Sequence, residues 1–191
     1  MVTSAQTMTI RKRILDAGVD LLETQGVAAL TQPRVAKAAG VSQSHLTYYF
    51  PTRNRLLMAL AETAVERLLD GLRVAADRPA DADAAQLFAE MILHHAPVRV
   101  LLGLIVAADR EPELRLSLAG LIARVRHGLA GLLEVKGLSA SPQQVLALHA
   151  GIVGLAVMNY ARQTAESEHE VRVGMAELFC RLVAGGAEGG R

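Results

Sequence analysis

Four short polar side chains, Gln43, Ser44, His45 and Thr47, form the stretch of this sequence best suited to chemistry on another molecule. An amide can bind adenine through two hydrogen bonds, and a threonine methyl can contact the methyl group of thymine. An imidazole can donate to an acceptor on guanine. These residue types, close together, predict a surface that reads base edges in duplex DNA.

The elements that must present these side chains are two short helices within residues 31–50. Gly40 ends the first helix, because a residue without a side chain adopts the left-handed conformation most easily. Ser42 caps the second helix, whose buried side is formed by Leu46 and Phe50. The alternative is an ordinary helical hairpin packed in a core, but the outward face lacks the Leu or Ile such a hairpin needs.

The composition indicates an all-α protein. Hydrophobic residues make up 51% of 191 residues, and Ala and Leu dominate them. The net charge is +1, yet residues 1–55 hold seven Lys or Arg and three acidic residues. A basic end on a more acidic body is typical of a phosphate-binding segment, although a solvated helical surface can produce it too.

The chain carries no sign of secretion or membrane insertion by simple inspection. The single Cys180 excludes an internal disulfide framework and fits a reducing compartment. The first nine residues lack the apolar run of a signal peptide. The longest apolar run, Val100–Ala108, is too short to span a bilayer. We therefore expect a cytoplasmic protein.

Periodicity and helix-ending residues predict about nine helices. An unstructured arm precedes a first helix over 10–24, in which Arg11, Lys12 and Arg13 are available to a phosphate backbone. A long helix over 52–76 follows the two-helix unit. Later helices are predicted over 82–95, from Pro97 to 109, and over 113–135, 142–164 and 170–184, before a glycine-rich tail without order.

The last two helices are apolar on more than one side. Leu146, Ala150, Val153 and Val157 form one stripe of the first of them. One side can cover the core, and the other needs a partner, for which a second copy of the chain is the simplest choice. The alternative is a monomer in which these helices are wholly buried.

Residues 10–60 resemble the DNA-binding segment of the TetR family of bacterial transcriptional regulators. The matching residues are Ile14, Ala17, Gly26, Thr31, Val35, Ala36, Ala39-Gly40-Val41-Ser42, Leu46, Tyr48, Phe50, Arg53 and Leu56. The resemblance implies a three-helix helix-turn-helix domain over 1–55, with the motif at 31–50, and a helical effector-binding and dimerisation domain over 56–191. Leu22, Val27, Ser44-His45 and Thr47 depart from the family pattern, which concerns the operator sequence rather than the binding mode.

The resemblance also implies roles for individual residues. Phosphate contacts are expected from Thr31, Arg34, Ser42, Tyr48, Tyr49 and Arg53, and base contacts from Gln43, Ser44, His45 and Thr47. A small-molecule effector is expected inside the domain over 56–191, which we call the body. The candidate residues are Met91, His95, Leu104, Arg126, His149, Met158 and Asn159. The implied function is a repressor, acting as a homodimer through its last two helices on double-stranded operator DNA, and released by an effector.

Other chemistry finds little support in the sequence. It contains no nucleophile elbow, P-loop or dinucleotide fingerprint, so we expect no enzyme activity and no cofactor. His94 and His95 are adjacent and diverge on a helix, so no metal site is expected. The alternative function is a helical small-molecule-binding or protein-interaction module without specific DNA binding.

Overall fold

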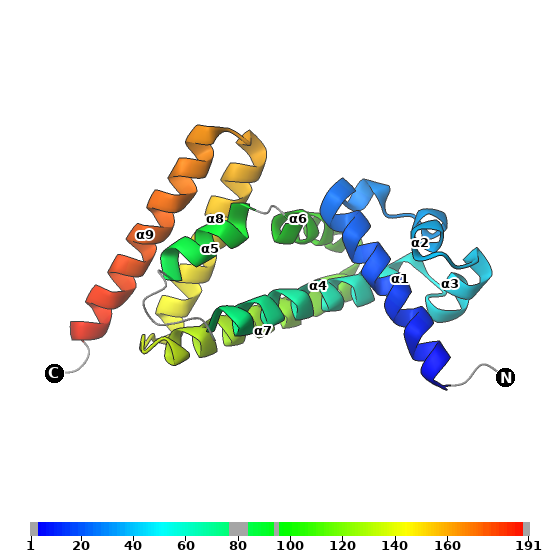
Figure 1. Ribbon diagram of the computed structural model, residues 1–191, viewed down its shortest axis with the longest axis horizontal. Helices are drawn as coiled ribbons and strands as arrows, with labels where there is room; N and C mark the ends of the chain where they lie inside the picture. Colours follow the sequence, from blue (N-terminus) through cyan, green and yellow to red (C-terminus); the bar gives the residue numbers. More distant parts are fainter. Residues whose placement is uncertain (1–3, 77–83, 94–95, 189–191) are drawn as a thin grey trace. The chain divides into compact units, whose positions relative to one another are not determined.

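The computed structural model describes residues 4–76, 84–93 and 96–188, and these form an all-α protein (Figure 1). The α-helices are α1 (Ser4–Gln25), α2 (Gln32–Ala39), α3 (Gln43–Tyr49), α4 (Arg53–Ala76), α5 (Ala84–Leu93), α6 (Ala96–Arg110), α7 (Pro112–Val135), α8 (Pro142–Arg162) and α9 (Ala165–Glu188), with a short 3₁₀ helix at Val27–Ala29. The prediction of an all-helical chain with about nine helices is confirmed for the described residues.

Three predicted boundaries are wrong. Helix α9 begins at Ala165 rather than at residue 170. Residues 4–9 were expected in an unstructured arm but belong to α1, because neither Gly nor Pro interrupts the chain between Ser4 and Ile10. The glycine-rich tail was expected to lack order from residue 185, but α9 continues to Glu188. Helix propensity is only a weak predictor of where a helix ends. Adding one more residue to a helix that is already formed costs far less than starting a new helix.

The described chain divides into two compact units. One comprises residues 1–67 and 99–121, and the other comprises residues 68–98 and 122–191. The helix-turn-helix segment over residues 31–50 lies within the first unit. A division into DNA-binding and effector-binding domains at residue 55 stays a prediction.

The core of the first unit fixes the orientation of α2 and α3. Ile14 of α1, Val35 of α2 and Leu46 of α3 are each fully buried in one hydrophobic cluster. Gly40 has φ 63°, and the amide of Val41 donates to the carbonyl of Ala36 at 3.0 Å. This left-handed C-cap closes α2 and turns the chain into α3, as the sequence predicted.

Two arginines attach α1 to other helices of the first unit. Arg67 of α4 lies 3.1 Å from the carboxylate of Asp16 and 2.8 Å from that of Asp20. The hydrogen bond from Lys12 lowers the pKa of Asp16, and Arg67 lowers it further. Arg99 of α6 donates to the carbonyls of Glu23 and Thr24. A cation at the unsatisfied carbonyls of a helix C-terminus stabilises that end.

In the second unit, α5 packs against α8 and α9, which run side by side (Figure 1). The rings of Phe88 and Phe179 lie 5.4 Å apart between centroids. A Cβ atom at Gly151 would lie 2.6 Å from Cδ1 of Leu178. Gly151 therefore allows α8 and α9 to approach within one chain, and substitution of Leu178 would disturb this packing.

Much of the apolar surface of α7 and α8 is not covered within the chain. By length and composition alone, both helices are long and apolar enough to cross a membrane. Only 22% of the apolar window of α7 and 17% of that of α8 are buried. Among the described residues, most of these two apolar windows is therefore exposed.

Candidate nucleic-acid interface

Helix α3 has one buried and one exposed side. Leu46 is 0% exposed and Phe50, at its C-cap, is 4% exposed, and both belong to the core of the first unit. Gln43, Ser44, His45 and Thr47 are all exposed. The structure thus brings the four predicted base-reading residues together on the solvent side of one short helix.

Hydrogen bonds within α3 leave two of these side chains unengaged. Ser42 Oγ accepts from the amide of His45 at 3.2 Å and lies 2.9 Å from Ser44 Oγ. Thr47 Oγ1 donates to the carbonyl of Gln43 at 2.9 Å, which leaves its methyl group for apolar contact. Within the part of the chain that the structure describes, the side chains of Gln43 and His45 form no hydrogen bond. Their amide and imidazole are therefore available to a ligand.

The residues expected at phosphates lie around the same helix. Thr31 occupies the N-cap position of α2, but its exposed hydroxyl accepts no capping hydrogen bond from the helix. Arg53 is exposed at the start of α4. Tyr48 is 77% exposed, whereas Tyr49 is half-buried and meets the Tyr48 ring edge-on at 5.2 Å.

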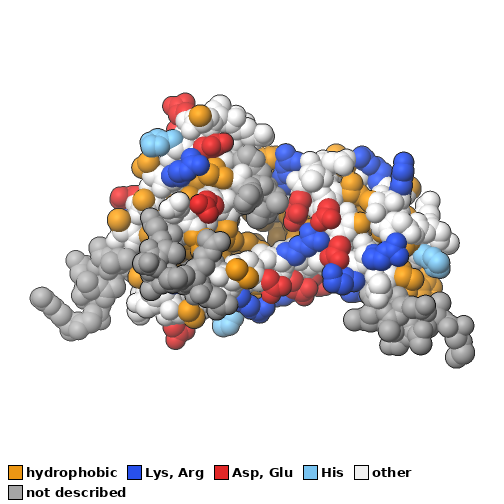
Figure 2. Space-filling model, viewed as in Figure 1, with side chains coloured by type: hydrophobic (Ala, Val, Ile, Leu, Met, Phe, Trp, Pro, Cys, Tyr) orange, Lys and Arg blue, Asp and Glu red, His pale blue; other side chains and the backbone are white. Residues whose placement is uncertain are grey.

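The guanidinium of Arg34 is exposed and donates to Oε1 of Gln25. Figure 2 shows Lys and Arg side chains at the surface over α1 to α3. Donors of this kind commonly hold a duplex in register through its phosphates.

Two of the three basic residues at positions 11–13, in the middle of α1, have contacts that the sequence did not reveal. Arg13 donates to the carbonyls of Ala39 at 2.7 Å and Gly40 at 3.2 Å. It thereby stabilises the C-terminus of α2 rather than pointing freely toward a phosphate. Arg11 lies 5.7 Å from the centre of the Phe50 ring. No local pattern signals either contact, because the partners are 26 to 39 residues apart in the sequence.

The predicted effector residues have different surroundings, and their role in binding an effector stays a prediction. Leu104 belongs to the core of the first unit, and His95 lies outside the described residues. In the second unit, Met91 is half-buried, Met158 is 51% exposed, and Asn159 is buried and accepts a 2.7 Å hydrogen bond from Ser167.

A hydrogen bond joins two of these candidates, Arg126 and His149. Nε of Arg126 donates to Nδ1 of His149 at 3.4 Å, which requires a neutral imidazole. Burial lowers the pKa of His149, and the positive charge of Arg126 lowers it further. The pair joins α7 to α8 and favours the uncharged histidine.

This pair makes the stability of the fold pH-dependent. A histidine has a pKa of about 6.5 in an unfolded chain. Because the folded value is lower, the unfolded state binds more protons over this range, so the free energy of unfolding falls as the pH drops below about 6.5. We expect His149→Gln to lose less stability than the wild type between pH 7.5 and 5.5, measured by urea unfolding. His169→Gln, at an exposed position, is the control for loss of a histidine; equal losses in all three proteins would contradict the assignment.

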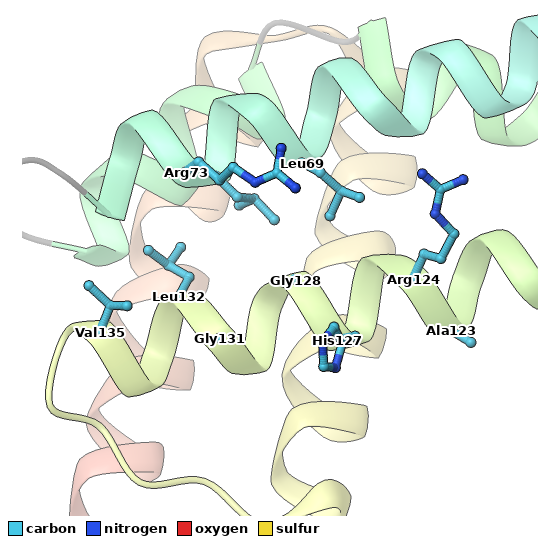
Figure 3. Close-up of a pocket in the computed structure, with 10 residues that line it drawn as sticks. Leu69, Arg73, Ala123, Arg124, His127, Gly128, Gly131, Leu132 and Val135 are labelled. Carbon is cyan, nitrogen blue, oxygen red and sulfur yellow. The ribbon is translucent and has the colours of Figure 1, made fainter.

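A groove that the sequence did not predict lies between α4 and α7 in the second unit (Figure 3). It has a volume of about 720 Å³, within the range of small-molecule sites. Leu69, Leu72 and Leu132 supply apolar lining, and Arg73 and Arg124 supply charge. None of the predicted effector residues that the structure describes lines it.

Comparisons with known proteins agree with this geometry. The model of a family described as bacterial regulatory proteins, tetR family, matches residues 14–60. The HTH-type transcriptional regulator CymR of Pseudomonas putida is 29% identical over 184 residues, covering 91% of this chain and 90% of the relative. EthR of Mycobacterium tuberculosis, also an HTH-type transcriptional regulator, is 31% identical over 75 residues, covering 39% of this chain and 35% of the relative. The crystal structure of the multidrug binding protein EbrR complexed with ethidium superposes with a TM-score of 0.65 at 27% identity, covering 88% of this chain and 97% of that one.

Proposed function

Because this chain belongs to the TetR family of bacterial transcriptional regulators, we propose that it represses transcription as a homodimer on operator DNA and is released by a small molecule. The observation that carries this proposal is the two-sided α3. Its apolar side is held in the core by Leu46, and its polar side is exposed. A helix supported in this way fits the major groove, which admits one α-helix.

The exposed side of α3 is assigned to base edges. Gln43 can bind adenine through two hydrogen bonds, His45 can donate to guanine, and the methyl of Thr47 can contact thymine. The residues assigned to phosphates are Thr31, Arg34, Ser42, Tyr48, Tyr49 and Arg53. Phosphate contacts orient the protein on the duplex, whereas base contacts carry the sequence preference.

A second copy of the chain is assigned to the outward stripe of α8. Leu146 is 45% exposed, Ala150 is exposed, and Met158 is 51% exposed, and all lie on the side of α8 away from its buried residues. On α9, Val173 is 54% exposed and Ala176 and Cys180 are exposed, at helical spacing. A symmetric dimer buries this surface in both copies and presents two α3 helices about 34–36 Å apart, one turn of B-DNA.

Release by an effector requires a difference in affinity between two conformations of the body. A ligand that binds better to a conformation in which the two α3 helices no longer match the operator spacing lowers the affinity for DNA. EbrR, whose structure contains ethidium, supports a body that takes up small molecules. Helix α4 extends from the first unit into the second and is suited to transmit the change.

The function is tested by a mobility-shift assay with the DNA that flanks the gene of this protein. A regulator gives a shift that weakens steeply as the salt concentration rises, because phosphate contacts release counterions. The alternative function, a helical binding or interaction module without specific DNA binding, predicts no preference for this DNA over an unrelated duplex.

His45→Ala should change the base preference of the protein. We expect discrimination at one operator position to fall by about 1–3 kcal/mol, because one side chain that reads a base is removed. Arg53→Ala is the matched control and should weaken all operator variants alike, since phosphates carry no sequence information. Binding constants for a set of single-base operator variants measure both. A uniform loss for His45→Ala would exclude its role as a reader.

A further inference from the structure

Two long polar side chains hold the segment that carries α3 at both of its ends. Helix α2 packs against both α1 and α3 (Figure 1). Before α3, Nη2 of Arg13 in α1 donates to the carbonyls of Ala39 at 2.7 Å and Gly40 at 3.2 Å. At the end of α3, Nε2 of Gln32 in α2 donates to the carbonyl of Phe50 at 3.0 Å. The backbone on each side of α3 is therefore tied to a neighbouring helix.

Gly40 gives Arg13 access to the turn before α3. A Cβ atom at residue 40 would lie 2.9 Å from Nη2 of Arg13, so a side chain at this position would crowd the guanidinium. Gly40 thus serves the turn twice, through its φ of 63° and through the room that it leaves for the arginine. The contact of Arg13 with this turn depends on the glycine.

Apolar packing alone defines the direction of α3 only loosely. Helix α3 has seven residues, and its buried side is anchored in the core mainly by Leu46 and Phe50. Apolar contacts are non-directional, whereas hydrogen bonds have preferred angles and weaken steeply when they are misaligned. The contacts of Arg13 and Gln32 therefore restrict the tilt and rotation of a short helix that its core residues restrict less.

We propose that Arg13 and Gln32 are positioning residues for base reading, which set the orientation of α3 through backbone carbonyls and contact no DNA themselves. The assignment rests on the proposed function, since it concerns how α3 lies in the major groove. Base contacts are hydrogen bonds to small groups on base edges, so a change in the tilt of α3 affects several of them together. A residue that only contacts phosphate does not have this effect, because phosphates carry no sequence information.

Arg13→Met and Gln32→Met test the assignment in the full chain. Methionine keeps an unbranched side chain and removes the donor, and water can bind the carbonyls instead, so the fold should persist, which urea unfolding checks. Affinities are measured for a duplex from the DNA that flanks the gene, for its single-base variants, and for an unrelated duplex of equal length. Each substitution should lower the preference for the flanking duplex over the unrelated one by about tenfold and weaken discrimination at several base positions together. Partial unfolding cannot mimic this result, because it reduces binding to every duplex alike.

Salt dependence separates positioning from a direct phosphate contact. Loss of one phosphate contact reduces the slope of log affinity against log salt concentration by about 1. The slope should stay unchanged in Arg13→Met, because this guanidinium is bound to carbonyls. Lys12→Met is the matched control. It removes one charge from the next position of α1, where the ammonium pairs with Asp16 at 2.7 Å, and it should keep the preference of the wild type.

Three results would overturn the positioning roles while leaving the proposed function intact. They are a wild-type preference in either Arg13→Met or Gln32→Met, a salt slope reduced by about 1 in Arg13→Met, and an equal loss of preference in Lys12→Met. A wild type that does not prefer the flanking duplex would overturn the proposed function, and the positioning roles with it.

Discussion

Ala150→Glu should convert the dimer into monomers and lower operator affinity by about three orders of magnitude. Ala150 is exposed at the centre of the outward stripe of α8, so the substitution is harmless within one chain. In a dimer it would bury a carboxylate without a partner, which costs several kcal/mol for each charge. Twofold symmetry brings two such charges into one interface. Because each 1.4 kcal/mol is about a factor of ten in an equilibrium constant, a cost of several kcal/mol corresponds to about three orders of magnitude in affinity.

Sedimentation velocity at a fixed protein concentration measures the change in mass, and mobility shifts measure the loss of operator binding. Ala119→Glu, at an exposed position of α7, is the matched control and should remain dimeric. A dimer that survives Ala150→Glu would place the interface on another surface. Leu178 is a poorer position for this test, because it packs on Gly151 within the chain.

Leu46→Ala should lower the free energy of unfolding by about 2–5 kcal/mol, the usual cost of removing a buried leucine side chain. Leu46 is 0% exposed in the core that supports α3. Since small domains are stable by only about 5–15 kcal/mol, this loss is a large fraction of the total. Operator binding should weaken as well, because α3 loses the support that holds its polar side toward solvent.

Thr47→Ala, one residue further along α3, is the matched control. Thr47 is exposed, and substitutions at such positions usually change stability by less than about 0.5 kcal/mol. Urea unfolding of the two variants compares the two sides of the helix directly. Equal destabilisation by both substitutions would contradict the assignment of α3 as a helix with one buried and one exposed side.

The sequence predicted the helix-turn-helix well because its signals are local. Gly40 and Ser42 lie within a few residues of the helix ends that they form, and the structure gives Gly40 a left-handed C-cap and Ser42 an N-cap. The burial of Leu46 and Phe50 and the exposure of Gln43 and His45 follow from helical periodicity alone. Such patterns depend on spacing rather than on distant partners.

The effector residues stay a prediction, because a pocket consists of residues that are distant in the sequence and local patterns do not record its walls. Met158 and Leu104 look alike in the sequence, but the first is half-exposed and the second is core. The groove forms where Gly128 lets α7 approach Leu69, and no pattern in either helix records that contact. The pairing of Arg126 with His149 joins two predicted residues, but neither lines the groove.

The sequence by itself determined which short helix has polar residues on its exposed side and apolar residues on its buried side. Tertiary structure alone decided which charged groups are engaged. Arg13 binds the C-terminus of α2, and Arg99 binds the C-terminus of α1. The reason is physical: a helix repeats every 3.6 residues and reveals its own sides, whereas the partner of a long side chain depends on which helices pack together.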